Sequence, residues 1–144
     1  MRRRACHRGG RQGVPCTCEM GNVYRFCEPI VLLILSRLGT AHGYQIAREA
    51  GPLSVTHAGL DSAAIYRSLR RLELAGCLTS SWDTDSGGPA RRVYALTPLG
   101  RQHLAEWVQV METIGASIGA LVQEGRTSLK SRRPPASRMG GRSA

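Results

Sequence analysis

The chain has 144 residues, of which 42% are hydrophobic and 5% aromatic, a composition that suits one globular domain with a mainly aliphatic core. It has no apolar run of the roughly 20 residues that cross a bilayer, and no apolar stretch directly follows the basic N-terminus, so we expect a cytoplasmic protein with neither a secretory signal nor a membrane partner. The net charge of +10 lies in the ends, since residues 1–25 carry +5, residues 126–144 carry +6 and residues 26–125 carry −1, so total charge alone does not establish a nucleic-acid-binding domain.

The basic, glycine-containing segment 1–25 is expected to be flexible. Cys16 and Cys18 lie in this segment and Cys27 follows it, and thiolates suit zinc, copper(I) or an iron–sulfur cluster. Cys-x-Cys is a weaker zinc signal than paired Cys-x-x-Cys. Two interpretations therefore stay open: metal or redox sensing by these three thiols, and free thiols on a flexible tail. We expect no required cofactor.

Two short helices open the expected domain. The first spans residues 28–39, where Pro29 suits the first helical position and Gly39 the C-terminal cap, and its continuous apolar character predicts burial on most sides. The second spans residues 40–51 and is amphipathic, and the glycine–proline pair at 51–52 is expected to stop it.

A third helix, residues 62–75, is expected after a connection at 53–61, with Asp61 as its N-cap. At 100° per residue its branched apolar side chains fall on one face, which we expect to be buried, while small, hydroxyl and cationic side chains lie away from it. Arginine can bind guanine edges or phosphate oxygens, and an ordinary solvated surface is the alternative. The expected DNA-contacting residues of this helix are Ser62, Ala63, Tyr66, Arg67 and Arg70.

Residues 77–82 and 91–96 alternate apolar and polar side chains, which predicts a β-hairpin with a polar, Gly-rich tip. Three helices followed by a hairpin is the order of a winged helix-turn-helix domain, in which the third helix enters the major groove and the hairpin, or wing, contacts the flanking DNA. We therefore expect this domain at residues 26–97, with Arg91 and Arg92 of the wing on DNA.

A fourth helix, residues 98–124, is predicted by the Thr97-Pro98 pair, and the basic segment 125–144 is expected to be a disordered tail. Apolar residues recur along this helix at alternating spacings of three and four, the pattern of a helix packed along another helix. We interpret it as a dimerisation helix, with packing against its own domain as the alternative. The expected interface residues are Leu104, Trp107, Met111, Ile114, Ile118 and Leu121.

The stretches ILSRLGTAHGYQIA, IYRSLRRLELAGCL and GGPARRVYALTPLGRQHL together resemble the PadR family of bacterial transcriptional regulators over about residues 28–108. The stretch SSWDTDSGGPARRVYALT is similar to the polyhydroxybutyrate-responsive repressor branch of that family. The resemblance implies a dimeric winged-helix repressor whose fourth helix forms the dimer interface. It also implies that Tyr44 anchors the second helix and touches a DNA phosphate. Ala64 is a departure, because many family members carry a hydroxyl residue there.

The sequence thus predicts a mainly α-helical protein with a small β-hairpin, a winged helix-turn-helix domain followed by a long C-terminal dimerisation helix. The expected function is sequence-specific transcriptional regulation, by a homodimeric repressor that binds a palindromic operator in double-stranded DNA through helix 62–75 and the wing at 78–96. The alternatives are a winged-helix protein-interaction module and a metal- or thiol-responsive regulator. A small-molecule effector at the dimer interface is a further expectation. We expect no enzyme, because the chain has no phosphate-binding glycine loop, nucleophile elbow or convergent pair of carboxylates.

Overall fold

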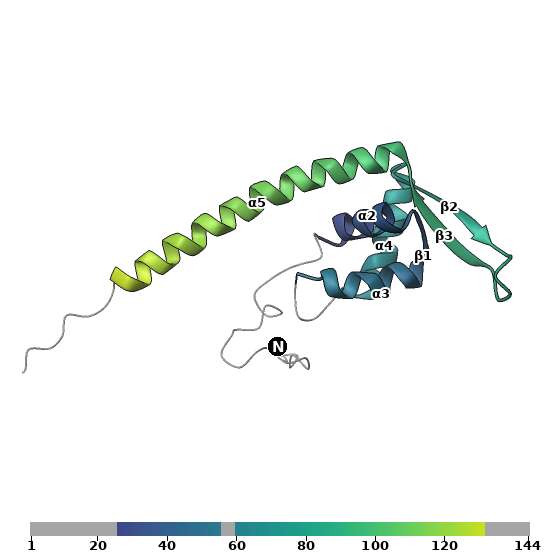
Figure 1. The fold of residues 1–144 in the computed structure, drawn as a ribbon, viewed down its shortest axis with the longest axis horizontal. Helices are drawn as coiled ribbons and strands as arrows, with labels where there is room; N and C mark the ends of the chain where they lie inside the picture. Colours follow the sequence, from purple (N-terminus) through teal and green to yellow (C-terminus); the bar gives the residue numbers. More distant parts are fainter. Residues whose placement is uncertain (1–25, 56–59, 132–144) are drawn as a thin grey trace, which may run out of the picture. The chain divides into compact units, whose positions relative to one another are not determined.

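The structure, a computed structural model, describes residues 26–55 and 60–131 (Figure 1). The expected flexible segment 1–25, with Cys16 and Cys18, lies outside the described residues, as does residue 132 onward of the expected tail. The described elements are α2 (Cys27–Leu38), β1 (Thr40–His42), α3 (Gly43–Leu53), α4 (Ser62–Leu74), β2 (Leu78–Asp83), β3 (Arg91–Leu96) and α5 (Pro98–Ser131).

The hydrophobic core lies among α2, α3 and α4 and is mainly aliphatic, as the composition predicts. Helix α2 buries seven of its twelve residues, which agrees with the prediction that it is covered on most sides. The other two helices each contribute a narrower stripe, of which Ile46 in α3 and Ile65 and Leu69 in α4 are fully buried. The core belongs to a compact unit that ends at Val108, and the rest of α5 forms a second unit.

The expected second helix at 40–51 is wrong at both ends. Its first three residues form β1, which pairs antiparallel with β3 and places Ala41 opposite Tyr94. The helix begins only at Gly43 and continues through Pro52 to Leu53, because a proline in the last turn removes only one intrahelical hydrogen bond. The predicted hairpin is therefore part of a three-stranded sheet in the order β1-β3-β2.

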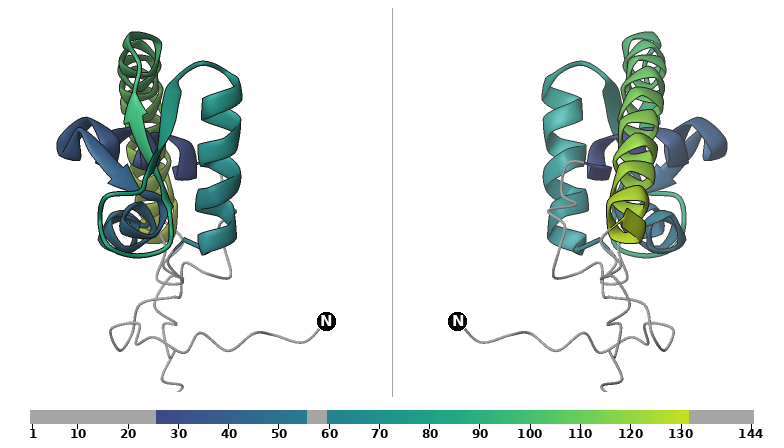
Figure 2. Two further views of the ribbon diagram at one scale, coloured as in Figure 1. Left: turned by 90° about the vertical axis from the view of Figure 1, so that its right-hand side faces the viewer. Right: turned by 90° about the vertical axis from the view of Figure 1, so that its left-hand side faces the viewer.

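Helix α4 and the hairpin form as predicted. The Asp61 side chain accepts a hydrogen bond from the backbone N–H of Ala63 at 3.2 Å, which caps α4. Strands β2 and β3 pair antiparallel from Leu78 opposite Leu96 to Asp83 opposite Arg91. Both views of Figure 2 show α4 lying alongside this hairpin.

Thr97 closes the base of the hairpin and starts α5. Its hydroxyl donates to the carbonyl oxygen of Gly76 at 2.7 Å and accepts from the backbone N–H of Gly100 at 3.1 Å. Helix α5 was expected to end at 124 but continues to Ser131, because residues 126–131 contain no proline or glycine and extending an existing helix is easy. None of the described helices combines the length and apolar character needed to cross a membrane.

Candidate nucleic-acid interface

The outward face of α4 carries cationic side chains that have no partner among residues 26–55 and 60–131. The helix buries Ala64, Ser68 and its branched apolar residues, and this fixes the opposite face outward. Arg67 and Arg70 are exposed on that face, and within the described residues neither guanidinium forms an ion pair or a hydrogen bond. The five residues predicted to face DNA from this helix are all exposed: Ser62, Ala63, Tyr66, Arg67 and Arg70.

Tyr66 joins α4 to the start of α3. Its ring lies against Gly43, where an added Cβ would come within 2.5 Å of the Tyr66 Cε1 atom. Only a glycine at this position allows so close an approach. The phenol therefore sits at the junction of the two helices and the sheet, with about half of its surface exposed.

A shallow hollow beside Tyr66 brings together side chains from α3, α4 and the sheet. At its rim the Arg91 guanidinium lies 5.4 Å from the centre of the exposed Tyr44 ring, a cation–π contact. The Tyr44 ring also stacks on His42, whose Nε2 lies 3.6 Å from a carboxylate oxygen of Asp83. The lining residues are His42, Gly43, Tyr44, Tyr66, Arg91, Arg92 and Tyr94.

A second hollow lies between α4 and the hairpin and shares Tyr66, Arg92 and Tyr94 with the first. Here Arg92 is engaged within the chain: its Nη2 donates to Glu73 at 3.0 Å and its Nε donates to the Ser80 hydroxyl at 2.9 Å. Arg91 and Arg92 were predicted alike, yet only Arg92 has an ion pair among the described residues. The lining residues are Tyr66, Arg70, Glu73, Leu74, Arg92 and Tyr94.

The structure thus brings four of the predicted residues around one surface: Tyr44, Tyr66, Arg91 and Arg92. Sequence reasoning did not identify Glu73 or Tyr94 as neighbours of these residues. Tyr94 lies two residues after Arg92 on the same strand, and side chains two apart on a strand share a face, so its place beside Arg92 could have been predicted from the sequence. Glu73 had no such signal, because its partner is 19 residues away on another element.

Cys27 is the one predicted metal ligand within the described residues, and it is buried, with 1% of its surface exposed. Burial raises the pKa of this thiol, and the hydrogen bond with Ser68 acts in the opposite direction. No group of three metal-binding side chains occurs in the described ranges. A metal or redox site formed with Cys16 and Cys18 stays a prediction.

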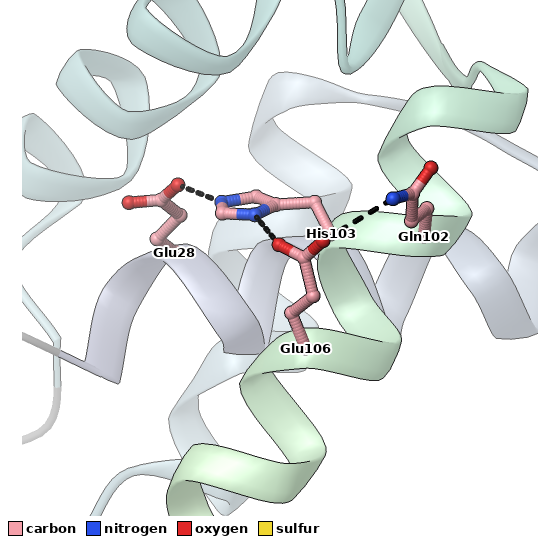
Figure 3. A network of polar contacts seen from close by, with 4 residues as sticks. All are labelled: Glu28, Gln102, His103 and Glu106. Carbon is pink, nitrogen blue, oxygen red and sulfur yellow. Dashed lines mark hydrogen bonds and ion pairs between the residues drawn. The ribbon is translucent and has the colours of Figure 1, made fainter.

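A polar cluster ties the first turns of α5 to α2 (Figure 3). His103 Nε2 lies 2.7 Å from a carboxylate oxygen of Glu28, and its Nδ1 lies 3.4 Å from Glu106, to which Gln102 also donates at 3.3 Å. Burial acts to lower the pKa of His103, but the hydrogen bonds with the two carboxylates outweigh it and raise the pKa above its ordinary value.

The six residues of the expected dimer stripe fall into two groups. Leu104 and Trp107 pack against the core of their own domain, so for these two the alternative interpretation fits. Further along α5, Ile114, Ile118 and Leu121 are 36%, 53% and 71% exposed, and Met111 is half-buried. These three residues therefore form an exposed apolar stripe on the part of α5 that the structure describes.

Comparison with known proteins agrees with this architecture. The family model described as "Transcriptional regulator PadR-like family" matches residues 31–106, more than half of the chain. A PadR family transcriptional regulator from Eggerthella lenta is similar in structure, with 26% identity, coverage of 74% of this chain and 90% of that one, and a TM-score of 0.58. A conserved protein of unknown function, described as a potential transcriptional factor, has 27% identity, coverage of 85% and 99%, and a TM-score of 0.66. An uncharacterized protein from Lysinibacillus sphaericus is 29% identical over 89 residues, which are 59% of this chain and 80% of that protein. The chain therefore belongs to the PadR-like family: it is a transcriptional regulator and not an enzyme.

Proposed function

We propose that this regulator is a homodimeric repressor that binds a palindromic operator in double-stranded DNA, with α4 in the major groove and the β2–β3 wing on the flanking backbone. The observation that carries the proposal is the outward face of α4, where Arg67 and Arg70, which have no ion pair among the described residues, share one face with the small side chain of Ala63. A small residue lets the helix approach the groove closely, and unpaired guanidiniums keep all their donors for base edges or phosphates.

The residues beside α4 supply backbone contacts in this proposal. Tyr44 and Tyr66 present exposed phenols, whose hydroxyls can donate to phosphate oxygens. Arg91 lies next to Tyr44 and has no carboxylate partner among the described residues, so its charge is available to the DNA backbone. Ser62, at the N-terminus of α4, offers a hydroxyl where the helix dipole also favours a phosphate.

The dimer rests on the apolar stripe of α5. Ile114, Ile118 and Leu121 expose apolar surface on one side of the helix, and a second copy of the same helix offers a surface of the same kind. A two-fold dimer presents two recognition helices, which is why the operator is proposed to be palindromic. Since its partner is chromosomal DNA, we place the protein in the cytoplasm. A small-molecule effector and the role of the N-terminal thiols remain predictions.

Gel-shift titration on the DNA upstream of the chain's own gene tests the recognition helix. The Arg67→Ala, Arg70→Ala double variant should bind at least about tenfold more weakly than the wild type, because each lost contact to a base or phosphate costs about 1 kcal/mol or more. The matched control is the Arg37→Ala, Arg71→Ala double variant, which loses the same charge from exposed positions off the outward face. Equal affinities for the two double variants would refute the assignment of α4.

A further inference from the structure

We propose that Arg92 is a positioning residue: together with Glu73 and Ser80 it holds the wing against the recognition helix, and Arg91 is the wing's DNA-contacting arginine. We refer to Glu73, Ser80 and Arg92 as the wing cluster. The inference rests on the proposed DNA-binding function and assigns different roles to two adjacent arginines that look equivalent in sequence.

The wing cluster is a closed set of hydrogen bonds between three elements. The Ser80 hydroxyl, on β2, donates to the Glu73 carboxylate, on α4, and accepts from Arg92 Nε, on β3, at 2.9 Å. Arg92 Nη2 completes the set by donating to the same Glu73 oxygen at 3.0 Å. Because each member contacts both of the others, the hairpin cannot move away from α4 without breaking at least two of these bonds.

Aromatic rings hold the Arg92 side chain in place from the strand side. Its guanidinium carbon lies 6.0 Å from the centre of the Trp82 ring and 5.8 Å from that of Tyr94. Trp82 is the cross-strand partner of Arg92, and Tyr94 lies two residues further along β3, so all three side chains lie on one face of the hairpin. A guanidinium fits this place because it is planar and can use two of its nitrogens at once, which an ammonium group cannot do.

The charges favour a positioning role over a phosphate contact. The Glu73 carboxylate neutralises the charge of Arg92, and the Glu73 side chain is only 24% exposed. Two of the five guanidinium N–H groups of Arg92 are already bonded to Ser80 and Glu73, and a phosphate bound by the others would lie beside the Glu73 carboxylate, whose negative charge repels it. Arg91, one residue away and without a carboxylate partner among the described residues, supplies a positive charge without that cost.

The two roles predict opposite effects of removing Glu73. If Arg92 bound phosphate, Glu73→Ala would free it and remove a repulsive charge, so the DNA would bind more tightly and with a steeper salt dependence. If Arg92 positions the wing, Glu73→Ala should weaken binding about tenfold while the slope of log affinity against log salt stays unchanged. The probe is a labelled duplex of the DNA upstream of the chain's own gene, titrated at several salt concentrations. Tighter binding by Glu73→Ala would overturn the inference.

Conservative variants of the two arginines provide the matched comparison. Arg92→Lys should lose as much affinity as Glu73→Ala, because lysine keeps the charge but has one nitrogen in place of the two that reach Ser80 and Glu73 in a fixed planar geometry. Arg91→Lys should keep most of the affinity, and Arg91→Ala should lower the salt slope by about one. Wild-type affinity for Arg92→Lys would contradict the positioning role.

A second readout does not depend on DNA. In a Trp107→Phe background Trp82 is the remaining tryptophan, and its fluorescence anisotropy reports on the motion of the hairpin. Glu73→Ala and Arg92→Lys should both lower this anisotropy, whereas Arg91→Ala should leave it unchanged. Hydrogen exchange of the β2 and β3 amides makes the same comparison in the unmodified background. If the wild type does not bind the upstream DNA, the proposed function fails, and the motion of the hairpin alone tests the positioning role. Unchanged hydrogen exchange and anisotropy in Glu73→Ala and Arg92→Lys would refute that role.

Discussion

Replacing Gly43 by alanine should weaken DNA binding more than it weakens the fold. The added Cβ would lie 2.5 Å from the Tyr66 Cε1 atom, whereas carbon atoms in contact are normally about 3.5 Å apart or more, so the ring must shift by about 1 Å. The Tyr66 ring is about half exposed and can rotate away, which limits the loss in unfolding free energy to about 1 kcal/mol, the low end for an overpacked site. The displaced phenol, however, lines both hollows of the candidate interface. We therefore expect about a tenfold loss of DNA affinity, which is about 1.4 kcal/mol.

Denaturant unfolding and gel-shift titration measure the two quantities in the same preparations. A Tyr66→Ser background removes the ring, and there Gly43→Ala should no longer destabilise the protein. Gly119→Ala is the control for the general effect of alanine in a helix: its Cβ meets nothing within 4 Å, and it should stabilise the chain by about 0.5–1 kcal/mol. An equal cost of Gly43→Ala with and without the Tyr66 ring would show that the ring is not the group displaced.

Three further predictions concern the helix α5 and its attachment. His103→Gln should lower the unfolding free energy by up to about 1 kcal/mol near pH 6 and by less near pH 9. Because the pKa of His103 is raised in the folded protein, the protonated ring stabilises the fold fully at pH values below its ordinary pKa of 6.5. This stabilisation is lost as the pH rises through the higher pKa of the folded state. A constant difference between the two proteins across this pH range, measured by urea unfolding, would contradict the assignment of a charged His103. Ile118→Asp should convert dimers to monomers in light scattering, whereas Ala116→Asp, on the opposite side of the helix, should leave the dimer intact; a dimeric Ile118→Asp variant would exclude the stripe as the interface. Gly100→Ala should destabilise the protein by about 2–4 kcal/mol, because its Cβ would lie 2.1 Å from the carbonyl oxygen of Cys77 and a backbone atom cannot rotate away as Tyr66 can; an unchanged melting temperature would refute this.

Local signals in the sequence were sufficient for most of the elements. Asp61 marks the start of α4 and the Thr97-Pro98 pair marks the start of α5, because capping depends on side chains within a few residues of the helix end. The burial of Ile65, Leu69 and Leu72 also followed from spacing alone.

Features that depend on distant partners could not be predicted in this way. Strand β1 has three residues, and it forms because β3, about 50 residues later, offers an edge to pair with. The stripe along α5 has one period throughout, so nothing in it separates Trp107, which packs on its own domain, from the exposed Ile118. Arg91 and Arg92 are equivalent in sequence, and only the placement of Glu73 beside the hairpin makes them different.

The hydroxyl of Thr97 mechanically links the segment after α4 to the start of α5. Because one oxygen atom bonds both to Gly76, just after α4, and to Gly100, in the first turn of α5, the two helices share an anchor point. A change in the direction in which α5 leaves its first turn must therefore either lengthen one of these two bonds or carry the end of α4 with it. The end of α4 and the start of α5 are thus joined through a single side chain.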